Sequence, residues 1–245
     1  DQMAEVSVDN FIILCSKAEG RDKMARFFQY GSRAISGLAS LAEPKAATAL
    51  GRLEVQAREL TTNLGAVRRT HRWCKEFPLI EALPKSILIK DPIERFLDVV
   101  SKGSLVVFNV LDHIGHLKQL KILPGGKKPG ANTIQLGLKF YFLSSLTGAL
   151  LMVREYIKLR ASEEEQPDQL RACFLTFVRH ISLLIQIGHL SAIIPSHESL
   201  CGLCGVLSSG IDLSRQWPAA KPRPSLTSGG PAVTQNGTAR PGRAA

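Results

Sequence analysis

The sequence predicts an all-α protein that combines amphipathic helices with one to three membrane-embedded hydrophobic helices. Two observations lead to this fold class. Apolar residues recur at steps of three and four along several segments, which places them on one face of a helix. Residues 134–153 form an apolar run of 20 residues with a single charge, Lys139, near one end. About 20 apolar residues are needed to cross the hydrocarbon core of a bilayer.

Composition points to an anionic partner. The chain of 245 residues carries a formal net charge of +10, which favours binding to nucleic acid or to an acidic lipid surface. Aromatic residues make up only 6% of the chain, and no motif typical of RNA or DNA recognition is present. We therefore expect anionic membrane lipids, and not nucleic acid, as the partner.

Breaks in the pattern divide the chain into regions. Two prolines, Pro78 and Pro84, interrupt the helical pattern, while Asp91 and Pro92 supply an N-cap and a first-turn proline. The predicted regions are an N-terminal amphipathic part (1–75), a connector (76–90), an amphipathic helix (91–123), a membrane-embedded helical part (133–217) and a disordered basic tail (218–245).

A short helix near residue 8 should end at Gly20 as a C-cap, and a longer helix follows from Arg21 to about Ala42. Large apolar residues share one face of the longer helix, and cations decorate the rest of its surface. We expect it to lie in a membrane interface, with an ordinary core-facing helix of a soluble bundle as the alternative. Its candidate interface residues are Arg21, Lys23, Met24, Arg26, Phe27, Phe28, Arg33, Ile35 and Leu38.

The next helix, residues 50–67, should pack antiparallel on the one before it. Its end carries four cations around an indole, a combination suited to an anionic headgroup layer, where each cation is worth roughly 1 kcal/mol. A solvated basic face is the alternative. The members of this candidate lipid-facing cluster are Arg68, Arg69, Arg72, Trp73 and Lys75.

Metal and phosphate sites are not expected in the middle of the chain. His113 and His116 lie on a helix with apolar neighbours, and a metal site needs more converging ligands. The loop 124–132 is rich in glycine and lysine but lacks the spacing of a phosphate loop.

Residues 134–153 are the strongest candidate for a transmembrane helix, with a buried central helix as the alternative. Residues 172–194 are also apolar, but Arg179 lies among them. An arginine in mid-span costs roughly 2.5 to 3.5 kcal/mol on insertion scales, so we expect an amphipathic helix half in the interface.

Residues 199–213 form a shorter apolar run that is rich in small residues. Small residues permit close contact between helices in a membrane, so Gly202, Gly205 and Ser209 are the candidate self-association face. Cys201 and Cys204 have the spacing of a redox dithiol but lack its strand-to-helix context, and we interpret them as packing residues.

Three stretches resemble the peroxin-11 family of peroxisomal membrane-elongation proteins. Gly20-Arg21-Asp22-Lys23, with Arg26 and Gln29-Tyr30, resembles its N-terminal signature. Arg68-Arg69-Thr70-His71-Arg72 is similar to its second basic stretch, and Cys201 to Gly210 to its C-terminal membrane segment. Order and spacing agree over residues 8–217.

The resemblance implies a peroxisomal membrane protein with both termini in the cytosol. It also implies a role in elongating the membrane and multiplying peroxisomes, together with the fission machinery and the import receptor for membrane proteins as partners. The physical mechanism would be insertion of an apolar helix face into one leaflet, concentrated by self-association.

Two other functions stay open: a membrane pore for small metabolites and a soluble helical adaptor. The sequence shows no paired carboxylates and no Ser-His-Asp pattern. We therefore expect neither an enzyme nor a protein with a cofactor or a metal.

Overall fold

The computed structural model describes residues 8–42, 47–162 and 166–218, and these form eight α-helices with no strand among them. The all-α prediction is confirmed. Nearly all of the predicted tail, from residue 219 on, lies outside the described residues. The helices are α1 (Val8–Ser16), α2 (Ala18–Ser40), α3 (Ala49–Thr70), α4 (Glu76–Ile87), α5 (Pro92–Gln119), α6 (Ala131–Ala161), α7 (Pro167–Leu190) and α8 (Glu198–Gln216).

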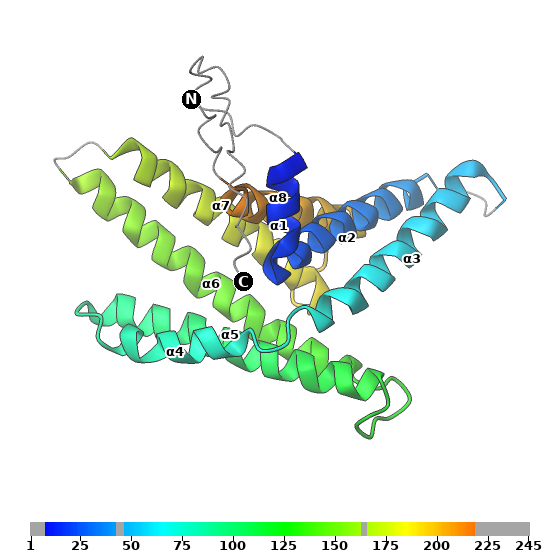
Figure 1. The fold of residues 1–245 in the computed structure, drawn as a ribbon, viewed down its shortest axis with the longest axis horizontal. Coiled ribbons are helices and arrows are strands. Elements are labelled where there is room, and N and C mark those ends of the chain that lie inside the picture. Colours follow the sequence, from blue (N-terminus) through cyan, green and yellow to red (C-terminus); the bar gives the residue numbers. More distant parts are fainter. Residues whose placement is uncertain (1–7, 43–46, 163–165, 219–245) are drawn as a thin grey trace, which may run out of the picture.

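The helices pack on one another in an order that closes on itself (Figure 1). From α4 the contacts run through α5, α6, α7 and α8 to α2, which also packs on α1 and α3, and α3 then touches α5. As predicted, α2 and α3 are antiparallel neighbours (Figure 1). The side chains that α2, α3, α5 and α7 turn inward therefore meet in one place.

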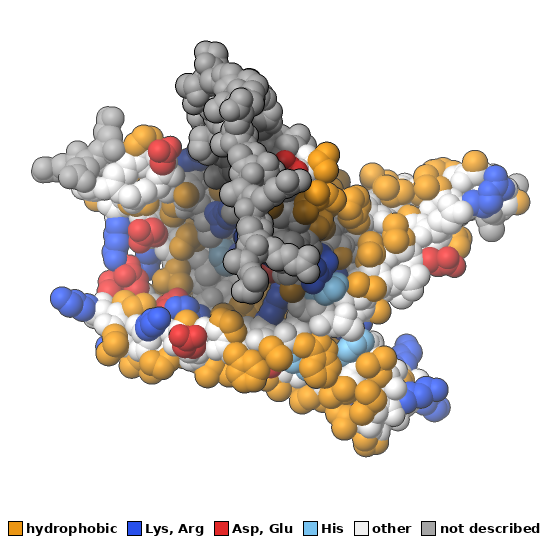
Figure 2. All heavy atoms as spheres, viewed as in Figure 1, with side chains coloured by type: hydrophobic (Ala, Val, Ile, Leu, Met, Phe, Trp, Pro, Cys, Tyr) orange, Lys and Arg blue, Asp and Glu red, His pale blue; other side chains and the backbone are white. Residues whose placement is uncertain are grey.

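Many of the buried side chains are polar, and many of the exposed ones are large and apolar, which is the reverse of a soluble helical bundle. Among the described residues, more polar and charged side chains than hydrophobic ones are buried, including Asp22, Arg26, Arg68 and Asp112. Large apolar side chains are exposed on every helix, and Figure 2 shows them spread over this face of the molecule. A soluble protein rarely exposes large apolar patches. This distribution is the one expected of a protein surrounded by lipid.

Among the described helices two, α6 and α7, are candidates to cross a membrane by length and composition. Only 33% and 28% of their most apolar stretches are buried, so neither helix is the mostly buried core helix of a soluble protein. The expectation that residues 172–194 lie only half in the interface stays a prediction, because length and composition make α7 a candidate span without placing it in a membrane. Arg179, the reason for that prediction, forms an ion pair with Asp212 of α8, and pairing offsets part of the insertion cost.

Two boundaries differ from the sequence prediction. The expected connector 76–90 is mostly helix α4, which includes Pro84. Pro84 has no backbone N–H, so α4 lacks one hydrogen bond of its ladder at that position. Gly20 is not a C-cap but lies inside α2, where an added Cβ would be 1.9 Å from the carbonyl oxygen of Leu14. By contrast, the predicted cap of α5 is confirmed, since the Asp91 carboxylate accepts hydrogen bonds from the amides of Ile93 and Glu94.

Small residues allow α8 to approach α2 closely. A Cβ at Gly202 would lie 2.3 Å from the backbone nitrogen of Ala34, and one at Gly205 would lie 2.2 Å from Cγ of Tyr30. The Ser209 hydroxyl is fully buried and donates to the carbonyl of Gly205 at 2.6 Å. The expectation of close helix contact was right, but the expected partner, a second copy, was wrong. This face of α8 is already occupied by α2 of the same chain.

A matched pair of glycine substitutions tests this packing. Gly205→Ala should lower the free energy of unfolding by about 1–3 kcal/mol, because its Cβ would overpack against Tyr30. A Cβ added at Gly103 on α5 has no atom within 4 Å. Gly103→Ala should therefore raise the free energy of unfolding by up to about 1 kcal/mol, because alanine has the higher helix propensity. Thermal unfolding of both variants in detergent, followed by circular dichroism, measures the difference. Equal stabilisation of both variants would contradict the packing.

Candidate functional site

Helix α2 has two faces of opposite character. Phe28, Ile35 and Leu38 point outward and are 55%, 46% and 51% exposed. On the other side Asp22 and Arg26 are each only 3% exposed. The predicted apolar stripe is real, but the expectation that Arg26 decorates the surface is wrong. The polar face of α2 is turned into the protein, where charged side chains have partners, and the apolar face is turned out.

The remaining predicted interface residues fall on both sides of α2. Met24 and Phe27 are half-buried, and the ring of Phe27 packs edge-on against that of Phe28 at 6.0 Å between centroids. Arg21 is exposed and its guanidinium donates to the carbonyl of Cys15 at the end of α1. Arg33 forms an ion pair with Glu198 at 2.7 Å.

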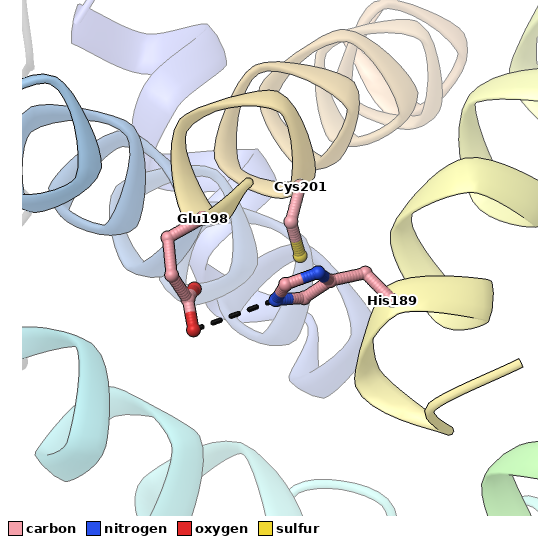
Figure 3. A group of neighbouring side chains, drawn as sticks. All are labelled: His189, Glu198 and Cys201. Atoms are coloured by element: carbon pink, nitrogen blue, oxygen red, sulfur yellow. Dashed lines mark ion pairs between the residues drawn. The ribbon is translucent and has the colours of Figure 1, made fainter. Parts of the chain in front are cut away.

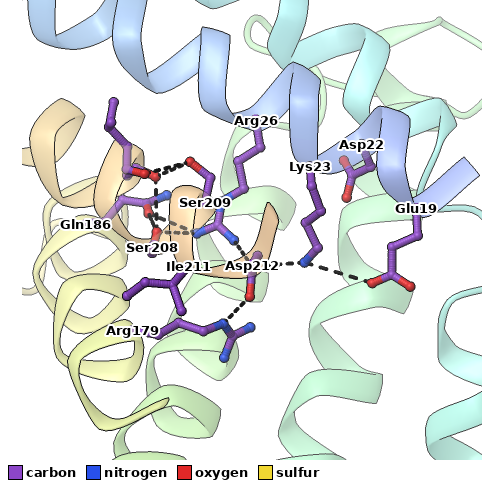
Figure 4. Close-up of polar contacts among 12 residues, drawn as sticks. Glu19, Asp22, Lys23, Arg26, Arg179, Gln186, Ser208, Ser209, Ile211 and Asp212 are labelled. Atoms are coloured by element: carbon purple, nitrogen blue, oxygen red, sulfur yellow. Dashed lines mark hydrogen bonds and ion pairs between the residues drawn. The ribbon is translucent and has the colours of Figure 1, made fainter. Parts of the chain in front are cut away.

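A first ion cluster is centred on Asp212 of α8 (Figure 4). Its carboxylate accepts from Lys23 Nζ at 3.0 Å, from Arg26 Nη1 at 3.2 Å and from Arg179 Nε. Nη2 of Arg26 donates to Gln186 Oε1 at 3.1 Å and to Ser208 Oγ at 2.9 Å. Three cations thus share one carboxylate, and α2, α7 and α8 are joined through it.

A second ion cluster is centred on Asp22. Arg68 Nε lies 3.1 Å from one carboxylate oxygen and Lys75 Nζ lies 2.9 Å from the other. Burial alone would raise the pKa of Asp22, but the charges of Arg68, Arg72 and Lys75 outweigh it and hold that pKa well below its usual range. Asp22 is therefore ionised, and it ties α2 to the end of α3.

A third cluster joins the α3–α4 turn to α5. Asp112 on α5 is 3% exposed and pairs with Arg72 at 3.1 Å and with Arg69 at 3.5 Å. Trp73 is 45% exposed and stacks on His113 with ring centroids 5.1 Å apart. The sequence analysis placed these cations, with Arg68 and Lys75, against lipid headgroups. The structure corrects this, because the four cations turn inward to carboxylates and only Trp73 faces outward.

Six of the seven cations of these clusters, all except Arg69, converge on a cavity of about 380 Å³. Aromatic and amide side chains share its wall, among them Phe108 and Tyr141, whose rings stack at 4.6 Å between centroids, and Gln186. The charged side chains that line it are Glu19, Asp22, Lys23, Arg26, Arg68, Arg72, Lys75 and Arg179. This basic cavity is the candidate functional site.

The sequence analysis missed the three aspartates that organise the site: Asp22, Asp112 and Asp212. One signal was available. Asp22, Arg26 and Tyr30 follow one another at steps of four, so they share a face that lies away from the apolar stripe of Phe28 and Ile35. A regular stripe of this kind fits a buried network of ion pairs and hydrogen bonds just as it fits a solvent-exposed polar face. Nothing local marks Asp112 or Asp212 as the partners.

A smaller cluster lies between the end of α7 and the start of α8, where Glu198 and Cys201 come close to His189 (Figure 3). His189 Nε2 is 3.4 Å from Glu198 Oε1. Arg33 binds the same Glu198 and lies 3.7 Å from the sulfur of Cys201, so a cation is already present beside these groups. The arrangement is an ion-pair cluster with Arg33 as its cation. Cys201 is fully buried, and both it and Cys204 are free thiols.

Comparison with known proteins supports a single family. The family model described as peroxisomal biogenesis factor 11 (PEX11) matches residues 8–217, nearly the whole chain. No curated protein and no solved structure matches the chain. The matched span includes every residue of the basic cavity and the apolar face of α2.

The Asp22 cluster makes a prediction about stability. Asp22→Asn leaves Arg68 buried without its counter-ion, so the free energy of unfolding should fall by about 3–5 kcal/mol. Glu54→Gln is a matched control, because its partner Arg58 is exposed and such a pair is worth about 0–1 kcal/mol. Denaturant unfolding in detergent at neutral pH compares the two.

The pH dependence of the same variants adds a second readout. The pKa of Asp22 is lower in the folded state than the unfolded value of about 3.9, so its stabilisation is complete above that pH and is lost as the pH falls below it. Asp22→Asn should remove this part of the acid sensitivity. An unfolding profile of Asp22→Asn that matches the unsubstituted protein at every pH would contradict the assignment.

Proposed function

Because the chain belongs to the peroxisomal biogenesis factor 11 (PEX11) family, we propose that it elongates the peroxisomal membrane by inserting the outer face of α2 into one leaflet. The family assignment by itself gives a role in peroxisome biogenesis, and α6 and α7 are compatible with a place in the membrane. The elongation mechanism is the step added here. One observation carries it: the apolar stripe of α2 stays exposed although the rest of the helix is packed into the protein.

Apolar side chains on segments next to this stripe are exposed as well. Leu41, just after α2, is 61% exposed, and on the adjoining α1 Val8 and Ile12 are 75% and 58% exposed. Full burial of each large side chain is worth roughly 1.5–3 kcal/mol, and the interface realises part of that. Several such side chains on one shallow surface displace lipid from one leaflet only. The area mismatch between leaflets favours curvature.

The polar side of α2 gives the wedge its rigidity. Ion pairs from Lys23 and Arg26 to Asp212, and from Arg68 to Asp22, fix α2 against α8 and α3. A wedge that is part of a folded bundle transmits its displacement to the whole protein. In this proposal anionic lipids contact the exposed Arg21. The membrane is bent by the whole folded chain and not by an isolated helix.

The remaining parts of the proposal concern partners and placement. We infer that the protein associates with itself, with the fission machinery and with the import receptor for membrane proteins, and that both termini face the cytosol. The small-residue face of α8 is occupied by α2, so self-association would use outward side chains instead. Leu203 and Leu207 of α8 are 52% and 49% exposed and are suited to such a contact.

A pore for small metabolites is the second candidate function. It is favoured by the basic cavity and by polar side chains buried on both candidate spans, such as Ser144 and Ser145 on α6 and Gln186 on α7. A pore conducts solutes whether or not vesicles change shape, and this separates it from the first proposal.

The elongation proposal is tested by changing the outer face of α2 alone. Phe28→Asp with Leu38→Asp should abolish tubulation of anionic liposomes by the reconstituted full-length protein, because two anchors become charges that are costly to insert. Gln56→Asp with Asn63→Asp adds the same charge at exposed polar positions of α3 and should keep tubulation. Electron microscopy of the vesicles provides the measurement.

The outcomes separate the two functions. Loss of tubulation only in the α2 variant supports the wedge. Equal tubulation by both variants would rule the wedge out, and solute flux through round vesicles would then favour the pore.

A further inference from the structure

We propose that the basic cavity is a binding site for a small anion that carries at least two phosphate groups. This inference goes beyond the elongation proposal and does not rest on it, since it concerns the inner, polar side of α2. The cavity of about 380 Å³ falls in the range of roughly 300–1,000 Å³ found for small-molecule sites.

The first argument is an excess of positive charge. Six cationic side chains line the cavity against two acidic ones, Glu19 and Asp22. The carboxylates behind them are shared, because Asp212 serves three cations, and Asp22 and Asp112 serve two each. Buried charge is costly unless it is compensated. An anion bound among these side chains would supply the missing negative charge.

The second argument is the kind of cation and its preorganisation. Four of the six are arginines, whose planar guanidinium donates two parallel hydrogen bonds to phosphate oxygens. Their side chains are already held by partners inside the protein, as Arg26 is by Asp212, Gln186 and Ser208. Little rotamer freedom is then lost on binding, which favours affinity.

The third argument is that the cations come from distant parts of the chain and surround the cavity. Lys23 and Arg26 belong to α2, Arg68 to α3, Arg72 and Lys75 to the α3–α4 turn, and Arg179 to α7. Figure 4 shows Lys23, Arg26 and Arg179 approaching Asp212 from two sides, and in Figure 2 Lys and Arg side chains are visible inside the hollow of this face. A single phosphate would reach only part of this set. An anion with two or more phosphates matches its extent.

Two sources of this chemistry are possible, a phosphorylated lipid headgroup and a free phosphorylated metabolite. Calorimetric titration of the full-length protein in neutral detergent with pyrophosphate tests the free form. For the lipid form, the protein is placed in phosphatidylcholine nanodiscs with or without a phosphatidylinositol bisphosphate. Protection of Lys23 and Lys75 from amine acylation, measured by mass spectrometry, reports occupancy in both arms.

The variants place binding in the cavity. Lys75→Gln should weaken binding about 10- to 100-fold, the loss of one charge-assisted contact, while Lys85→Gln on the exposed side of α4 should leave it unchanged. Arg72→Gln is the stronger test, with its helical content checked by circular dichroism. Acylation of the unsubstituted protein tests the proposal even if a variant fails to fold.

Protection by pyrophosphate alone assigns the site to a soluble metabolite, and protection by the phosphoinositide alone assigns it to a lipid headgroup. Protection by neither probe overturns the proposal. The proposal would also be overturned if Lys75→Gln and Arg72→Gln bound the anion as strongly as the control Lys85→Gln. The anion would then bind elsewhere.

Discussion

The structure depends on one constraint, that buried charges must find partners inside the protein. Three aspartates, Asp22, Asp112 and Asp212, hold seven cations from α2, α3, the α3–α4 turn and α7. In hydrocarbon no water can replace a missing partner, so polar groups gather in the interior and apolar groups are left outside. The closed order of helix contacts follows, since each ion pair joins elements that are distant in the sequence.

Helix α2 links the interior to the outer surface. Asp22, Arg26 and Tyr30 point to the charged interior, and the stripe through Phe28 and Leu38 points away from it. The same helix therefore contributes to the basic cavity and carries the exposed apolar face. In the proposed mechanism, a change of charge inside the cavity would act on the helix that is inserted into the membrane, which gives a physical route from anion binding to membrane shape.

The sequence was a good guide to local structure and a poor guide to orientation. Periodicity identified which residues of α2 share a face, but it could not say that the charged face is the inner one, because both choices have the same period. For the same reason the cations of residues 68–75 were assigned to lipid. Gly202 and Gly205 indicated a close helix contact, while the identity of the partner, α2, depends on tertiary packing. The aspartates that pair with the cations lie up to 189 residues away in the sequence, and no local signal connects them.

The most direct test of this inverted arrangement is fluorescence quenching at one position of α2. With Trp73→Phe and Trp217→Phe as background, Leu38→Trp places the only tryptophan on the outer face. In bilayers that contain brominated lipid, we expect strong quenching of this tryptophan and little quenching by aqueous acrylamide. Strong quenching by acrylamide with none by the brominated lipid would show that the apolar face of α2 lies in water, and it would contradict the account.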